Sequence, residues 1–182
     1  METNRQSFNR VFFEYRILVY NLALHYVTNA EDAEEVTQDV FVKMHQSLHK
    51  FAEQSSIKTW IYRITVNCCL DFIKHKNSKK RFFIFGRKHD DEKQYAQLPD
   101  FEHPGIILEN KETAKVLFAA ISELTENQKT AFILSKVEGL GNQEISQVME
   151  LSISSVESLL FRAKKTLQDK LAVKFDEYSR KK

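Results

Sequence analysis

Near its C-terminal end, the chain combines hydroxyl, carboxylate and cationic side chains at helical spacing. The stretch runs from Gly139 to Leu167 and reads GLGNQEISQVMELSISSVESLLFRAKKTL. Serine hydroxyls can hydrogen-bond to phosphates or base edges, and arginine and lysine side chains neutralise phosphates. This chemistry suits a contact with DNA. The side chains that we predict on the contacting face are Asn142, Gln143, Ser154, Ser155, Glu157, Ser158, Phe161, Arg162, Lys164 and Lys165.

The apolar residues of the same stretch predict a helix-turn-helix that positions this polar face. Asn142 is expected to cap a short helix and Ser152 a longer one. In such a motif the second helix enters the major groove of DNA. An ordinary helical hairpin with a solvated charged face is the alternative that the pattern leaves open. The side chains expected inside are Ile145, Val148, Met149, Val156, either Leu159 or Leu160, Ala163 and Leu167.

A second group of residues interleaves aromatic and cationic side chains on one predicted helix in the first half of the chain. Unpaired bases stack on aromatic rings while cations follow the backbone. Trp60 lies on the apolar stripe and can instead be a core residue, and the cations of KHKNSKKR can be a solvated helix end. Asn67 and Asp71 are i and i+4 neighbours that can bond each other. The group comprises Ser55, Ser56, Lys58, Trp60, Tyr62, Arg63, Asn67, Lys74 and Lys76.

Three long amphipathic helices are predicted before residue 81, where they would hold this group. The second follows a TNAED restart that Thr28 or Asn29 can cap, and the third begins at Ser55 or Ser56. Long helices with short connections favour a small bundle, so we assign residues 1–80 to one domain. The expected inner stripes are Phe8, Phe12, Tyr15, Leu18, Val19, Leu22 and Tyr26; Ala33, Val36, Val40, Met44, Leu48 and Phe51; and Ile57, Trp60, Ile61, Ile64, Cys68 and Phe72.

Residues 81–105 lack periodicity and contain both prolines, which is typical of a flexible linker. Its apolar start, RFFIFG, either extends the third helix or packs on a partner. Residues 106–182 are assigned to a second domain of four short helices. Thr125 and Gln128 form a capping-box pattern there, and Gly139 is expected to be the C′ residue that ends the same helix. The helix before it should bury Ile107, Leu117, Ala120, Ile121 and Leu124.

The composition of the 182-residue chain favours an all-α protein, and its motifs do not indicate an enzyme. Only four Gly and two Pro occur, and 42% of the residues are hydrophobic, which suffices for two small helical domains. Because no nucleotide-binding glycine loop, metal cluster or nucleophile–base pair is evident, we expect no cofactor, metal or small-molecule substrate. Cys68 and Cys69 are adjacent and are expected to be buried thiols in a reducing compartment. The lack of an apolar signal or membrane span favours the cytoplasm.

Several segments resemble the extracytoplasmic-function branch of the sigma-70 family of bacterial RNA polymerase sigma factors. AEDAEEVTQDVF is similar to that family's core-polymerase-binding helix, and TWIYRITVNCCLDFIK is similar to its helix that reads and opens the promoter −10 region. LTENQKTAFILSKVEGLGNQEISQVMELSISSVESLLFRAKKTL resembles its −35-reading domain. The likeness spans residues 8–81 and 106–171, in the family's order. Glu157 and Leu159 depart from the pattern, because the family more often carries cations there.

The resemblance implies a specificity subunit that binds core RNA polymerase and promoter DNA and that an anti-sigma factor can hold. The acidic second helix would dock on the polymerase, where opposite charge would steer assembly. The third helix and the loop before it would capture flipped-out −10 bases, and the second domain would bind −35 DNA. The polymerase-binding side chains implied are Asp32, Glu35, Gln38, Asp39, Lys43 and Gln46. A solvated helix face is the alternative for this set.

Two other functions fit parts of the pattern. A stand-alone helix-turn-helix regulator would use residues 1–80 for sensing or dimerisation, and it would bind duplex DNA specifically without polymerase. A helical adaptor that binds no nucleic acid would show no salt-dependent DNA affinity. Binding to core polymerase followed by transcription separates these alternatives from a sigma factor.

Overall fold

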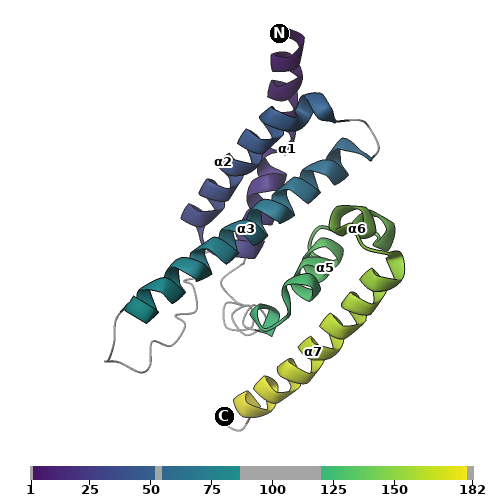
Figure 1. Cartoon of the computed structure of the whole chain (residues 1–182). Coiled ribbons are helices and arrows are strands. Elements are labelled where there is room, and N and C mark those ends of the chain that lie inside the picture. The colour runs from purple at the N-terminus through teal and green to yellow at the C-terminus, as the bar shows by residue number, and fades with distance from the viewer. Residues whose placement is uncertain (1, 52–54, 87–119, 180–182) are drawn as a thin grey trace. The chain divides into compact units, whose positions relative to one another are not determined.

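The computed structural model of the chain contains two compact helical units, residues 1–100 and 101–182. It describes residues 2–51, 55–86 and 120–179, and every regular element in those ranges is a helix (Figure 1). The prediction of an all-α chain with two helical domains is confirmed. In these same ranges, no helix combines the length and the apolar character needed to cross a membrane.

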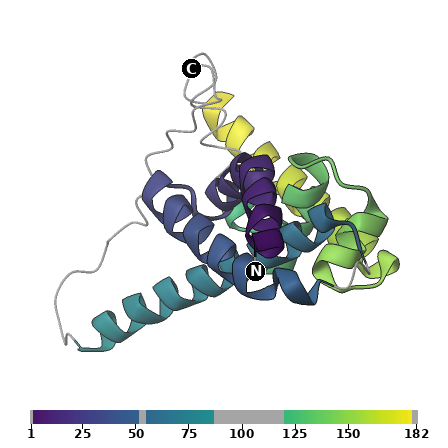
Figure 2. The same cartoon turned by 90° about the horizontal axis from the view of Figure 1, so that it is seen from above.

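The first unit is built from α1 (Glu2–Val27), α2 (Ala30–Ser47) and α3 (Ile57–Gly86), with a short 3₁₀ turn η1 (Leu48–Lys50) after α2. Each of the three α-helices packs against the other two (Figures 1 and 2). All three expected apolar stripes contribute to the shared core. Its fully buried side chains include Val19, Leu22, Ala33, Val36, Val40, Met44 and Ile61.

The starts of α2 and α3 are fixed by side-chain caps. Asn29 caps α2, because its Oδ1 accepts a hydrogen bond from the backbone N–H of Asp32 at 2.8 Å. Thr28 precedes it with φ 64°, a left-handed conformation that separates α1 from α2. Ser56 rather than Ser55 caps α3, since Ser56 Oγ accepts from the N–H of Thr59 at 3.0 Å. Both caps were among the predicted pairs of alternatives.

The α3 helix continues past residue 80, where we expect the first domain to end. It runs to Gly86, which confirms the helical alternative for RFFIFG. No glycine or proline occurs between Ile57 and Phe85 to stop the helix. The C-terminal turns of α3 project beyond α1 and α2 (Figure 2). The remainder of the expected linker, residues 87–105, lies outside the described residues.

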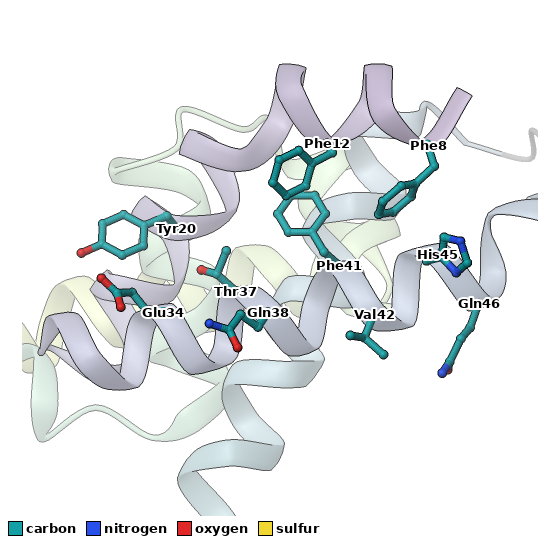
Figure 3. A pocket seen from close by; sticks show the side chains of 10 residues that line it. All are labelled: Phe8, Phe12, Tyr20, Glu34, Thr37, Gln38, Phe41, Val42, His45 and Gln46. Carbon is teal, nitrogen blue, oxygen red and sulfur yellow. The ribbon is translucent and has the colours of Figure 1, made fainter. Parts of the chain in front are cut away.

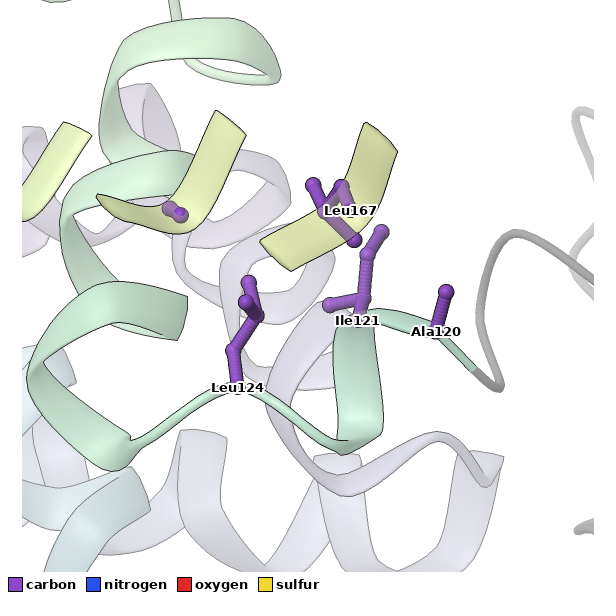
Figure 4. Packing of buried hydrophobic residues seen from close by; sticks show 5 residues of the cluster. Ala120, Ile121, Leu124 and Leu167 are labelled. Carbon is purple, nitrogen blue, oxygen red and sulfur yellow. The ribbon is translucent and has the colours of Figure 1, made fainter. Parts of the chain in front are cut away.

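The second unit contains α5 (Glu126–Lys136), α6 (Asn142–Met149) and α7 (Ile153–Ser179), preceded by the helical residues 120–122. One part of its core joins Ala120, Ile121 and Leu124 to Ala163 and Leu167 of α7 (Figure 4). The expected burial of these five side chains is confirmed. The expected burial of Ile107 and Leu117 concerns residues 106–119, which lie outside the described residues. The expectation of four short helices is wrong for α7, which has 27 residues, since its apolar spacing continues through Leu171.

Of two helix caps predicted in the second unit, one is confirmed and one is wrong. The box of Thr125 and Gln128 is confirmed, with each side chain bonding to the other's backbone. Asn142 is not the cap of α6: Gly141 holds that position, and its N–H donates to Glu144 Oε2 at 2.9 Å. Asn142 is instead the first helical residue, which frees its amide for another contact. Gly139 adopts the left-handed conformation expected of it, with φ 71°.

Candidate nucleic-acid and partner interfaces

The outer face of α2 presents most of the polar residues that the sequence analysis assigned to polymerase binding. Glu35, Gln38, Asp39, Lys43 and Gln46 are exposed. Asp32 is half-buried, and its carboxylate is already occupied by Asn29 Nδ2 at 2.6 Å and by an ion pair with Lys76 of α3. Asp32 therefore contributes to the cap and to interhelical packing in this conformation.

Ion pairs connect α2 with α3 at a second point. Lys43 Nζ lies 3.7 Å from Asp71 Oδ2, so Asp71 pairs across the helices. Burial raises the pKa of the Cys68 thiol, and the nearby Asp39 and Asp71 add to this shift, while Lys43 opposes it. Burial lowers the pKa of Lys43, but Cys68 and Asp71 outweigh it, so the net pKa of Lys43 is raised. Lys43 thus stays cationic in the groove between the two helices.

An apolar groove lies between α1 and α2. In Figure 3, Phe8 and Phe12 of α1 point towards Phe41 of α2. The ring centroids of Phe12 and Phe41 are 4.7 Å apart, and the groove encloses about 730 Å³. Gln38 and Gln46 belong to its lining, which joins it to the polar face of α2. The groove therefore adds apolar surface to the residues assigned to polymerase binding.

Exposed apolar side chains extend this surface. Phe13 and Ile17 of α1 are each 65% exposed, and Val42 of α2 is 54% exposed. Such side chains are typical of contacts with other proteins when polar residues surround them. Sequence reasoning missed them because only the core-facing stripes were followed. The run VFV at residues 40–42 was an available signal, since three consecutive apolar residues cannot all face the core of one helix.

The α3 helix exposes the cations expected to contact DNA but buries one of the aromatic rings. Lys58, Asn67, Lys74 and Lys76 are exposed, whereas Tyr62 is only 2% exposed. The ring of Tyr62 cannot stack on a base in this conformation, which corrects its expected role. Its burial follows from its place on the core side of α3, beside Ile61 and Thr65.

The remaining α3 candidates lie near the start of the helix. Trp60 is half-buried and packs on Phe51, with ring centroids 5.2 Å apart. Arg63 and Ser55 are also half-buried, while Ser56 is exposed and acts as the cap. Trp60 thus remains partly accessible while its ring packs on Phe51.

The α6 and α7 helices form the predicted helix-turn-helix. Ile145 and Val148 of α6 and Val156 of α7 are buried, as expected. The turn is set by Glu150, which has φ 55°, and by Ser146 Oγ, which donates to the carbonyl of Leu151 at 2.6 Å. Ser152 caps α7 by accepting from the N–H of Ser155 at 3.2 Å. These contacts therefore define the turn and the start of α7.

The start of α6 and the outer face of α7 carry the side chains predicted to meet DNA. Asn142 is half-buried, and its Nδ2 donates to Glu157 Oε1 at 3.5 Å, which joins α6 to α7. Leu159, which departs from the family's cationic pattern, is half-buried. Phe161 is 69% exposed. The other predicted contacts are all exposed: Gln143, Ser154, Ser155, Glu157, Ser158, Arg162, Lys164 and Lys165.

Family models match both units. The model described as Sigma-70 region 2 matches residues 11–79, and the model described as Sigma-70, region 4 matches residues 112–167. The first covers α2 and most of α1 and α3, and the second covers α5, α6 and the first turns of α7. Together they match most of the chain.

Curated relatives and solved structures agree with these models. The chain is 27% identical over 169 residues to the ECF RNA polymerase sigma-E factor of Haemophilus influenzae, covering 92% of this chain and 89% of that one. It is 26% identical over 178 residues to the RNA polymerase sigma-H factor of Pseudomonas aeruginosa, covering 92% and 88%.

Among solved structures, the sigma factor RpoE in complex with the anti-sigma factor NepR from Bartonella quintana has a TM-score of 0.65 at 19% identity, covering 92% of this chain and 98% of that one. CnrH in complex with the cytosolic domain of CnrY has a TM-score of 0.64 at 20% identity, covering 93% and 90%. These structures share the fold. With both family models matched in order, the chain belongs to the sigma-70 family and is an RNA polymerase sigma factor of the extracytoplasmic-function type.

Proposed function

We propose that the described surfaces divide the work of a sigma factor among α2, α3 and the helix-turn-helix. The chain directs RNA polymerase to promoters, and it acts as a specificity subunit in the cytoplasm without bond-making chemistry of its own. The observation that carries the proposal is the exposed cationic face of α7 on a capped helix-turn-helix, in the same chain as a region 2 unit.

The polymerase would bind across α2 and the groove beside α1. Protein interfaces combine an apolar centre with a polar rim, and this surface offers both. The exposed Val42 and the groove lined by Phe8 and Phe12 supply the apolar part, while exposed polar side chains supply the rim: Glu35, Gln38 and Asp39. Asp39 is the most informative of these, because it lies outside the core stripe and its replacement disturbs no buried packing.

Promoter DNA would be opened along α3. Unstacking DNA costs about 1.4 kcal/mol per base-pair step, and base–aromatic stacking returns about 1–3 kcal/mol per captured base. With Tyr62 buried, Trp60 is the accessible aromatic ring among the predicted α3 contacts. The binding free energy of the free chain is therefore too small to keep a promoter open, and contacts from polymerase must supply the remainder. Lys58 and Asn67 are exposed and would bind the displaced strand.

An anti-sigma factor is a further proposed partner. The Bartonella quintana neighbour was solved in complex with the anti-sigma factor NepR, and CnrH with the cytosolic domain of CnrY. The apolar groove and the exposed Phe13 and Ile17 give such a partner a surface of the required chemistry on the first unit.

Transcription with core polymerase tests the proposal. We expect the full chain with core polymerase, but neither component alone, to produce specific run-off transcripts and permanganate-reactive thymines near the −10 position. Lys58→Ala and Asn67→Ala should reduce the permanganate signal while polymerase binding persists, and Lys136→Ala, an exposed cation on α5, serves as the control. Specific duplex binding without polymerase would favour a stand-alone regulator. Absence of DNA binding in the presence of polymerase would favour an adaptor.

A further inference from the structure

Phe161 is an exposed aromatic residue in the centre of a polar helix face. Its side chain is 69% exposed. At about 100° per residue, Ser154, Ser158, Phe161 and Lys165 lie on one line along α7, opposite the buried Val156, Ala163 and Leu167. Phe161 therefore points directly away from the core, where a polar side chain would be expected. Among the described residues, this exposure leaves most of the ring outside any packed core.

The surroundings of Phe161 indicate what the ring meets. Arg162, Lys164 and Lys165 are exposed on the same helix, and Ser158 lies one turn before Phe161. This combination of cations, hydroxyl groups and one apolar ring favours duplex DNA, because phosphates pair with the cations and the major groove carries one apolar group, the C5 methyl of thymine. A protein partner would be expected to need a larger apolar patch.

We propose that Phe161 reads a thymine methyl group in the −35 element and so sets part of the promoter specificity of this sigma factor. The proposal rests on the proposed −35 role of α7. Phenylalanine is one of the side chains that make apolar contact with this methyl group in the major groove. The contact distinguishes thymine from cytosine and also from uracil, which has the same hydrogen-bonding edge but lacks the methyl group.

Replacing thymine with uracil tests the contact without altering the protein. The full chain with core polymerase is first used to select duplexes from a pool randomised across the upstream half of the promoter. Each selected thymine is then replaced by deoxyuridine. We expect one thymine position, or two neighbouring ones, at which uracil weakens wild-type binding about fourfold, the equivalent of one buried methyl-sized group.

Phe161→Ala completes the double-mutant cycle. The variant should bind the selected duplex about as weakly as the wild type binds the uracil form, and uracil should weaken its binding no further. Val137→Ala is the matched control, since Val137 is 48% exposed and lies at the C-terminal end of α5 rather than on α7. Circular dichroism of each variant should match that of the parent.

The outcomes separate this inference from the proposed function. If the wild type selects an upstream sequence but uracil has no effect at any thymine, or has the same effect in Phe161→Ala, the methyl contact is refuted while the −35 role stands. If Phe161→Ala impairs polymerase binding with DNA preference unchanged, the ring is a protein contact and the inference is also refuted. If the wild type selects no upstream sequence, the −35 role fails, and the inference with it.

Discussion

Removing Arg162 should reduce the salt dependence of promoter binding by an amount that its position predicts. Arg162 is exposed on the outer part of α7, in the third turn of the proposed recognition helix. Each phosphate neutralised on duplex DNA contributes about 0.9 to the slope of log K against log salt. Between 50 and 200 mM salt, one contact therefore weakens binding about 3.5-fold. Arg162→Ala should lower the slope by about 0.9.

Lys170→Ala provides a control that removes the same charge from the same helix. Lys170 forms an ion pair with Glu123, and at 100° per residue it lies away from the Ser154–Lys165 line. Its loss should change the slope by much less than one unit. Fluorescence anisotropy of the full chain with core polymerase, on one promoter duplex over a salt series, measures both variants. Equal slopes for wild type and Arg162→Ala, or equal changes in both variants, would refute the assignment of a phosphate contact to Arg162.

Three further predictions concern the polymerase face, the core and the buried thiol. Asp39→Arg should weaken assembly with core polymerase at least tenfold in a pull-down titration while circular dichroism stays unchanged; undiminished binding would remove α2 from the interface. Ile145→Ala should destabilise the second unit by about 3 kcal/mol, since Ile145 is fully buried, whereas Val137→Ala should stay within about 0.5 kcal/mol in urea unfolding. Burial raises the pKa of Cys68, so the thiol stays protonated to a higher pH in the folded chain than in the unfolded chain. The free energy of unfolding should therefore fall as pH rises from about 8 through the folded pKa. Cys68→Ala should flatten that pH dependence, and identical slopes for the two proteins would contradict it.

Local signals in the sequence predicted the helices and their starts well. Asn29, Ser56, Thr125 and Ser152 all act as caps, because a cap depends on a side chain and a backbone N–H only three residues away. The buried positions of α2 were also correct, since one apolar stripe faces one core. The predicted cap of α6, Asn142, is one residue too late. Gly141 is the cap residue although it has no capping side chain, and its N–H donates to the carboxylate of Glu144.

The accessibility of α3 could not be predicted in the same way. The buried face of α3 is wider than the expected stripe, because Tyr62 and Val66 are buried beside Ile61. Trp60, which lies on that stripe, is buried only in part. A helix that carries aromatic residues on several sides gives no sequence signal for which ring faces solvent. Only the crossing of three helices decides this.

The ion pairs between α2 and α3 show why the surface assignments needed a structure. Asp32 was assigned to the polymerase face and Lys76 to the DNA face, yet the two side chains pair with each other across 44 residues of sequence. Lys43 of α2 and Asp71 of α3 form a second pair further along the helices, with the two charges exchanged. Charge segregation correctly placed acids on α2 and cations on α3, but opposite charges on adjacent helices also attract each other. Asp39 on α2 and Lys58 and Asn67 on α3 are exposed and lie outside these pairs. They are therefore the better residues for testing the polymerase and DNA contacts.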